Sequence, residues 1–155
     1  MTQLSTHFTL AAFIESDMAK RRDINNDLPL TLTANAKNTC EMMERIRAHL
    51  CSLAGKTIPT IITSGYRGPL LNRAIGSKDT SDHTLALAVD FKAPAFGSAL
   101  SVSLALAPLV SVLGIGQLIY EFESWVHVST RIPDKIINRI ITINKRGTHA
   151  GILEA

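Results

Sequence analysis

The sequence predicts a single α+β domain in which a mainly antiparallel sheet is flanked by helices. Its 155 residues are 46% hydrophobic, which suits one globular unit with a sizeable core. A long helical pattern comes first, and several short runs with strand character follow, with one helical run among them. This segregation of helices and strands is typical of the α+β class. We see no internal repeat, low-complexity tract or interdomain linker, so the expected domain is residues 1–155.

The clearest predicted element is a helix over residues 33–53. Thr33 is its expected N-cap, and Gly55 is expected to end it. Apolar residues recur along it at spacings of three and four and form one stripe: Ala36, Cys40, Met43, Ile46, Leu50 and Leu53. A stripe of this kind indicates core packing rather than a cofactor site.

The only two cysteines, Cys40 and Cys51, both fall in this helix. Eleven residues of helix separate their Cα atoms by about 16 Å. Because a disulfide requires Cα atoms within about 7 Å, the two cannot pair with each other. We expect two buried thiols and no zinc role for them.

The remaining elements are predicted from alternating polarity and from the positions of glycine and proline. In chain order they are a strand over 58–64, a short helix over 69–76, a polar loop over 77–82, a strand over 86–91, a helix near 97–110, and strands near 117–122, 125–129 and 138–144. In the run 86–91, Ala86, Ala88 and Asp90 would share one face of the strand. Small neighbours leave room for a metal beside Asp90, which places the expected metal site on the sheet.

An uncharged stretch over residues 93–120 is long enough to cross a bilayer. Pro108, Gly114 and Gly116 interrupt it, and it continues into the strand near 117–122. We therefore expect a buried helix followed by a central strand, and no membrane insertion.

The charge distribution argues against binding to nucleic acid. The net charge is +3, and Lys20-Arg21-Arg22 is the only tight basic cluster. The eight aromatic residues (five Phe, two Tyr and one Trp) do not alternate with basic ones, so we expect no nucleic-acid partner. We expect a monomer.

Two histidines and an aspartate form the main candidate site. His83 and Asp90 are seven residues apart, and His127 follows 37 residues later. Two imidazoles and one carboxylate are the protein ligands of many hydrolytic zinc sites, which leave a fourth position to water. We therefore predict that His83, Asp90 and His127 bind Zn²⁺. The other histidines have no companion ligands at metal spacing and are expected to be structural or surface residues: His7, His49 and His149.

The motifs around these residues resemble the zinc peptidases of the D-Ala-D-Ala carboxypeptidase type, which include phage and bacterial peptidoglycan endopeptidases. The signature of that family is similar to Ser-x-His-x-x-Gly-x-Ala-x-Asp, preceded by Ser-Gly-Tyr-Arg and followed by Trp-x-His-x-Ser. The matching residues here are Ser64-Gly65-Tyr66-Arg67, Ser81, His83, Ala88, Asp90, Trp125, His127 and Ser129, with Ala86 in place of the glycine. The opening Leu4–Phe13 also resembles the start of the family, so the resemblance covers about residues 4–130.

The resemblance implies roles for four residues around the metal. Arg67 would bind the substrate carboxylate or steady the tetrahedral intermediate, since a guanidinium makes strong hydrogen bonds to an oxyanion. Ser81 would position a ligand or the substrate by hydrogen bonding. Tyr66 and Trp125 either line the substrate cleft or pack in the core, and the sequence leaves both alternatives open.

The general base is a choice between two glutamates. Many family members carry an acid three positions before the second ligand histidine, and that position is Ser124 here. If residues 122–125 form a hairpin turn, Glu123 lies at its exposed tip and Glu121 at the end of the preceding strand. We therefore predict Glu121 as the base, with Glu123 as the alternative.

These residues imply a zinc-dependent peptidase that hydrolyses stem or cross-bridge peptides of peptidoglycan, in lysis of the cell wall by a phage or prophage. The alternative is a non-catalytic wall-binding or virion module that keeps the fold and the metal, which the missing acid at Ser124 favours. A serine hydrolase is a weaker third hypothesis, because the chain has no Gly-x-Ser-x-Gly motif. The amino terminus has no basic segment followed by an apolar one. We thus expect synthesis in the cytoplasm without a signal peptide, and action on the wall after release or as part of a virion.

Overall fold

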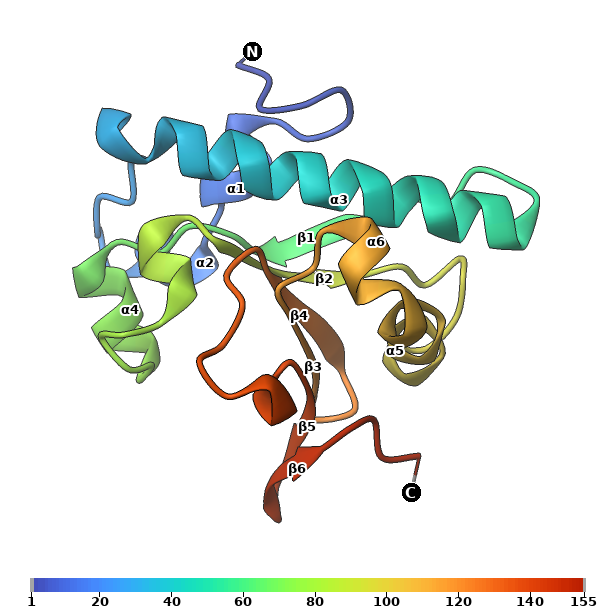
Figure 1. The fold of residues 1–155 in the computed structure, drawn as a ribbon. Helices are drawn as coiled ribbons and strands as arrows, with labels where there is room; N and C mark the ends of the chain where they lie inside the picture. The colour runs from blue at the N-terminus through green and yellow to red at the C-terminus, as the bar shows by residue number, and fades with distance from the viewer. Residues whose placement is uncertain (1, 155) are drawn as a thin grey trace.

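A six-stranded sheet with the strand order β1-β2-β4-β3-β5-β6 is the centre of the structure. The computed structural model describes residues 2–154 (Figure 1). Neighbouring strands pair antiparallel except β3 and β5, which are parallel. The predicted α+β class with a mainly antiparallel sheet is confirmed. The helices and strands are α1 (Leu10–Ile14), α2 (Asp17–Arg21), α3 (Thr33–Ala54), β1 (Ile61–Ser64), α4 (Pro69–Ile75), β2 (Ala88–Lys92), α5 (Ala99–Leu106), α6 (Val110–Leu113), β3 (Gln117–Glu121), β4 (Trp125–Ser129), β5 (Ile140–Asn144) and β6 (Gly147–Ala150).

Helix α3 is the long helix that the apolar stripe predicted, and it crosses the sheet on the side of β1 and β2 (Figure 1). A short 3₁₀-helix (Leu30–Leu32) precedes it, so Leu32 is the N-cap and Thr33 is the first helical residue. The predicted N-cap at Thr33 was therefore wrong by one position. Gly55 ends the helix in the left-handed conformation, with φ of 67°, as expected.

The core lies on one face of the central strands. Side chains that alternate with the candidate ligands pack into it: Val89, Phe91, Leu118, Val126 and Val128. They meet the buried stripe of α3 and residues of α5, such as Val102 and Leu106. Because strand side chains alternate, Asp90 and His127 point to the opposite face of the sheet.

Strand β2 begins two residues later than predicted. Residues Asp82–Leu85 form a 3₁₀-helix, η2, and Ala86 ends it in the left-handed conformation with φ of 58°. The expected common face of Ala86, Ala88 and Asp90 was therefore wrong, because Ala86 belongs to the cap of this turn. Glycine adopts such a conformation without strain, which explains why glycine suits this position of the family signature.

The uncharged stretch folds as α5, a short 3₁₀-helix (Ala107–Leu109), α6 and β3. The helix expected over 97–110 is thus interrupted where Pro108 cannot donate a helical hydrogen bond. Within residues 2–154, no helix combines the length and the apolar character needed to cross a bilayer.

The carboxyl-terminal strands extend the sheet beyond β3. Strand β5 corresponds to the run predicted near 138–144, whereas α1, α2 and β6 were not predicted.

Both cysteines are free, and burial raises the pKa of the Cys40 thiol to about 12, so this thiol is unreactive at neutral pH.

Candidate metal centre

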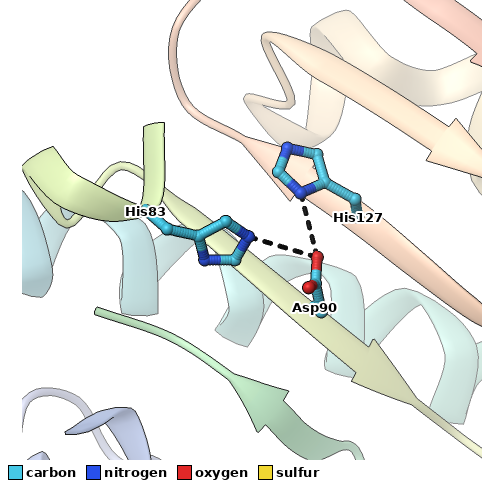
Figure 2. Close-up of side chains that lie close together, drawn as sticks. All are labelled: His83, Asp90 and His127. Atoms are coloured by element: carbon cyan, nitrogen blue, oxygen red, sulfur yellow. Dashed lines mark hydrogen bonds and ion pairs between the residues drawn. The ribbon is translucent and has the colours of Figure 1, made fainter. Parts of the chain in front are cut away.

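Three elements bring His83, Asp90 and His127 together (Figure 2). Asp90 lies in the middle of β2 and pairs with His127 of β4, directly across the antiparallel ladder. His83 comes from η2, the turn that precedes β2. The site therefore stands on neighbouring strands at the centre of the sheet, with one ligand supplied by the adjacent turn.

The three side chains converge on one point. Asp90 Oδ1 lies 3.3 Å from His83 Nε2 and 2.9 Å from His127 Nδ1, and all three candidate ligand atoms lie within 4.8 Å of one another. Around a tetrahedral zinc ion with ligands at about 2.0–2.2 Å, ligand atoms are about 3.3–3.6 Å apart. The 3.3 Å separation of His83 Nε2 and Asp90 Oδ1 and the chemistry of the donor set fit a zinc ion, and the 2.9 Å contact between Asp90 and His127 would lengthen by a few tenths of an ångström around it.

A backbone carbonyl sets the orientation of the His83 ring. His83 Nδ1 lies 2.7 Å from the carbonyl oxygen of Gly65, so Nδ1 carries the proton and donates it. The other ring nitrogen, Nε2, then presents its lone pair toward Asp90. This is the outer hydrogen bond that zinc-binding histidines commonly make, and the ring is held before any metal arrives.

Gly65 is needed because the backbone approaches closely here. A Cβ atom at this position would lie 2.2 Å from the carbonyl oxygen of Phe13 at the end of α1. The same carbonyl accepts a hydrogen bond of 2.8 Å from the backbone N–H of Tyr66. Gly65 thus lets α1 dock against the segment that orients His83.

The turn that carries His83 is held at its amino-terminal end by two side chains. Ser81 caps η2 by accepting a hydrogen bond of 3.3 Å from the backbone N–H of His83. The buried carboxylate of the next residue, Asp82, accepts a hydrogen bond of 2.8 Å from Ser129 Oγ at the end of β4. Arg131 forms an ion pair with the second carboxylate oxygen of Asp82. These contacts link the His83 turn to the strand of His127.

Burial and the shared Asp90 carboxylate shift the pKa of both histidines. Burial lowers the pKa of His83, although the neighbouring Asp90 carboxylate opposes this. Burial also acts to lower the pKa of His127, but the hydrogen bond and the charge of Asp90 raise it overall. Burial acts to raise the pKa of Asp90, whereas the two histidines lower it overall, so the carboxylate is ionised at neutral pH. Neutral imidazoles and a carboxylate are the forms that bind a metal, so the raised pKa of His127 opposes metal binding as the pH falls.

Arg67 and Glu121 lie beside the three candidate ligands. Glu121 pairs with Trp125 across β3 and β4 and faces the same side as His127, with its carboxylate 3.9 Å from His127 Nδ1. Burial raises the pKa of Glu121. Burial lowers the pKa of Arg67 overall, and the charges of Asp90 and Glu121 oppose this shift. The Nε atom of Arg67 is buried and has no hydrogen-bond partner among residues 2–154, so this guanidinium keeps a donor that a ligand could use.

The β3–β4 turn separates the two glutamates. Phe122 and Glu123 have φ values of 49° and 59°, and the backbone N–H of Ser124 donates to the carbonyl of Glu121. This is the left-handed geometry that a tight hairpin requires, and it costs non-glycine residues some strain. Glu123 is exposed at the tip, whereas Glu121 ends the strand on the metal side.

Tyr66 and Trp125 differ in their surroundings. Tyr66 is 4% exposed and belongs to the hydrophobic core, and its contact with a substrate stays a prediction. Trp125 is partly buried on the metal face and stacks at a tilt on Phe122, with 5.7 Å between ring centroids. The position of Trp125 is compatible with contact to a substrate.

Sequence reasoning missed Asn26 and Asp82, two buried polar residues near the site. Asp82 stands inside the Ser-x-His motif, so its place next to a ligand was the available signal. Asn26 had no such signal, because it contacts the site region only through tertiary structure.

The amino-terminal His7 lies away from the metal centre and hydrogen-bonds Glu44 of α3, at 2.7 Å from Nδ1 to Oε2.

Comparison with known proteins agrees with this geometry. The family model described as Peptidase M15 matches residues 6–129, and the chain belongs to this family. It is the zinc D-Ala-D-Ala carboxypeptidase-type family, so the predicted resemblance is confirmed and the chain is of the metallopeptidase class. Peptidases of this family depend on zinc and act on peptides. No curated protein matches the chain.

Proposed function

We propose that this protein is a zinc-dependent peptidase that hydrolyses a peptide bond in the stem or cross-bridge peptides of peptidoglycan. The observation that carries the proposal is the convergence of His83, Asp90 and His127 with Arg67 and Glu121 beside them. Peptidoglycan lies outside the cytoplasmic membrane, so the protein would act on the wall after release from the producing cell, as in phage lysis, or as part of a virion.

His83 Nε2, Asp90 Oδ1 and His127 Nδ1 would hold the zinc ion. A zinc ion with three such ligands lowers the pKa of a bound water to about 7 and polarises a carbonyl oxygen. The chain supplies the orientation: Gly65 holds the His83 ring, and the Asp90–His127 pair fixes the other two donors.

Glu121 would take the proton from the attacking water and deliver it to the leaving amine. Its carboxylate lies on the same face as the ligands and close to His127. Burial raises its pKa above the ordinary value of 4.5, which brings a carboxylate nearer to the range in which it can both accept and donate a proton. A bound zinc ion would oppose part of this shift.

Arg67 would bind the carboxylate of the substrate or the oxyanion that develops at the scissile carbonyl. A guanidinium can make two parallel hydrogen bonds to a carboxylate, and the buried Nε of Arg67 has no partner within the described chain. A substrate with a free terminal carboxylate would use this donor in a carboxypeptidase, whereas an endopeptidase would use it on the oxyanion.

The alternative function is a non-catalytic module that binds the wall and keeps the metal. The absence of an acid at Ser124 favoured it. Glu121 lies on the metal face and can take the place of that acid, because the strand pairing brings it back across from Trp125. The geometry thus supports the enzyme over the binding module.

The experiment is digestion of purified peptidoglycan by zinc-loaded protein, with the released muropeptides analysed by mass spectrometry. We expect new amino and carboxyl termini at one type of peptide bond, and loss of the activity with a chelator that is restored by zinc. The identified bond distinguishes a carboxypeptidase from an endopeptidase. Zinc-loaded wild-type protein that binds peptidoglycan but releases no fragment would establish the binding module instead.

Two variant pairs test the assigned residues. Glu121→Gln should keep the zinc and lower kcat by about 10²–10⁴-fold, the usual contribution of proton transfer, whereas Glu123→Gln should be nearly silent. Arg67→Ala should cost about 1.5–3 kcal/mol in kcat/KM at unchanged zinc content. Arg73→Ala, which removes only an exposed ion pair with Asp79, is the matched control. The reverse pattern between Glu121 and Glu123 would assign the base to the turn.

A further inference from the structure

Asn26 is a buried side chain that uses its whole amide to hold three backbone groups. It lies in the segment between α2 and α3 and is 9% exposed. Its Nδ2 group donates to the carbonyl oxygens of Ile14, at 2.9 Å, and Tyr66, at 3.0 Å. Its Oδ1 atom accepts a hydrogen bond of 2.8 Å from the backbone N–H of Gly68.

Two of these three groups flank Arg67. Tyr66 precedes it and Gly68 follows it, so Asn26 holds the backbone on both sides of Arg67. The backbone N–H of Arg67 itself donates to the carbonyl oxygen of His83, at 3.1 Å. His83 in turn donates from its ring to Gly65 of the same segment. The position of the guanidinium and that of the His83 ligand are therefore set by one small network.

Only an asparagine satisfies this arrangement at this size. The site needs two donors directed at carbonyl oxygens and one acceptor directed at an N–H, which is the inventory of a primary amide. An aspartate would keep the acceptor for Gly68 but direct an oxygen at the carbonyls of Ile14 and Tyr66. The adjacent Asn25 is exposed and accepts only a local hydrogen bond from the N–H of Asp27, at 2.7 Å.

We propose that Asn26 is a positioning residue, which places Arg67 over the metal centre by holding the backbone before and after it. The functional part of this inference rests on the proposed role of Arg67 toward the substrate. The geometric part rests on the hydrogen bonds of Asn26 alone. Asn26 touches no candidate ligand, so it acts through the Arg67 segment.

The first test follows the backbone and does not require activity. Amide hydrogen exchange of the full chain, measured by NMR, should become faster at Gly68 and Arg67 in Asn26→Ala. The matched Asn25→Ala variant should leave both amides unchanged. Equal protection of Gly68 in wild type and Asn26→Ala would overturn the proposal. If Asn26→Ala does not fold, Asn26→Ser serves instead, because one short hydroxyl cannot supply the two donors and the acceptor of the amide.

The second test is a double-mutant cycle in kcat/KM on the muropeptide that the wild type cleaves. Asn26→Ala should lower kcat/KM by about 10–100-fold at full zinc content, as is typical for residues that orient a site. In the Arg67→Ala background the same change should cost less than about twofold, since its partner is gone. Equal losses in both backgrounds would overturn the proposal, because a general loss of stability acts in either.

The two tests separate this inference from the proposed function. A wild type that cleaves no wall peptide would refute the proposed function, while faster exchange at Gly68 in Asn26→Ala would still support the positioning of the Arg67 segment. An active wild type with unchanged exchange and equal kinetic losses would refute the positioning role and leave the peptidase intact.

Discussion

Gly65→Ala tests the close approach between α1 and the segment that orients His83. The added methyl group would lie 2.2 Å from the carbonyl oxygen of Phe13, 3.0 Å from its carbonyl carbon and 3.1 Å from its Cδ1 atom. Two of these three atoms are backbone, so no side-chain rotation relieves the overlap. The end of α1 or the backbone at Gly65 must move by about 1 Å to restore ordinary contacts.

The structure allows the cost to be worked out. Overpacking of this kind typically costs about 1–3 kcal/mol. The displacement also weakens the hydrogen bond from Tyr66 N–H to Phe13, worth about 1 kcal/mol. We therefore expect Gly65→Ala to lower the free energy of unfolding by about 2–4 kcal/mol. The shifted Gly65 carbonyl no longer holds the His83 ring, so zinc affinity should fall by about 10–100-fold.

The assay is urea denaturation of the zinc-free protein, with zinc affinity measured separately by competition with a chelator. Gly55→Ala is the control, because a Cβ there meets nothing within 4 Å and the cost comes only from a φ of 67°. That strain is about 1 kcal/mol and should leave zinc affinity unchanged. A Gly65→Ala variant that is no more destabilised than Gly55→Ala and binds zinc as tightly as wild type would show that this close approach does not orient His83.

Three further predictions concern the metal, the His83 turn and pH. Purified protein should contain about one zinc per chain, and His83→Ala should lose it while His49→Ala retains it; elemental analysis showing equal zinc in both variants would contradict the assignment. Ser129→Ala removes the only hydroxyl donor to a buried carboxylate and should lower the free energy of unfolding by about 1–3 kcal/mol, together with zinc affinity; an unchanged urea midpoint would refute this. Burial raises the pKa of Glu44, but hydrogen bonds from His7 lower it overall from 4.5. A carboxyl group whose pKa is lowered on folding stabilises the fold above pH 4.5. This stabilisation is lost as the pH falls toward the pKa of the folded state. Glu44→Gln should therefore cost about 1–2 kcal/mol at neutral pH and progressively less in acid, and a pH-independent difference in unfolding free energy would exclude this linkage.

The elements that sequence reasoning predicted well are those whose pattern is local. The stripe of α3 repeats over many turns, and the alternation of 125–129 places His127 on the face opposite Val126 and Val128, as observed. The motif residues His83, Asp90 and His127 could be named because their spacing, their expected strand faces and the resemblance to the family signature together predict a metal site. Strand β2 was predicted too early because the alternation of small residues continues through Ala86, whereas the cap of η2 occupies that position.

What only the tertiary structure decided depends on contacts between segments that are distant in the chain. The register of β3 on β4 brings Glu121 to the metal face and leaves Glu123 on the turn, although the two residues have the same parity in the sequence. Asn26 and Gly65 derive their importance from backbone groups that reach them across the fold. Local propensity determines which segments form helices and strands, but the partner of a buried amide or carbonyl is set by how those segments pack. For that reason the candidate ligands could be named from the sequence, and the groups that hold them in place became evident only in three dimensions.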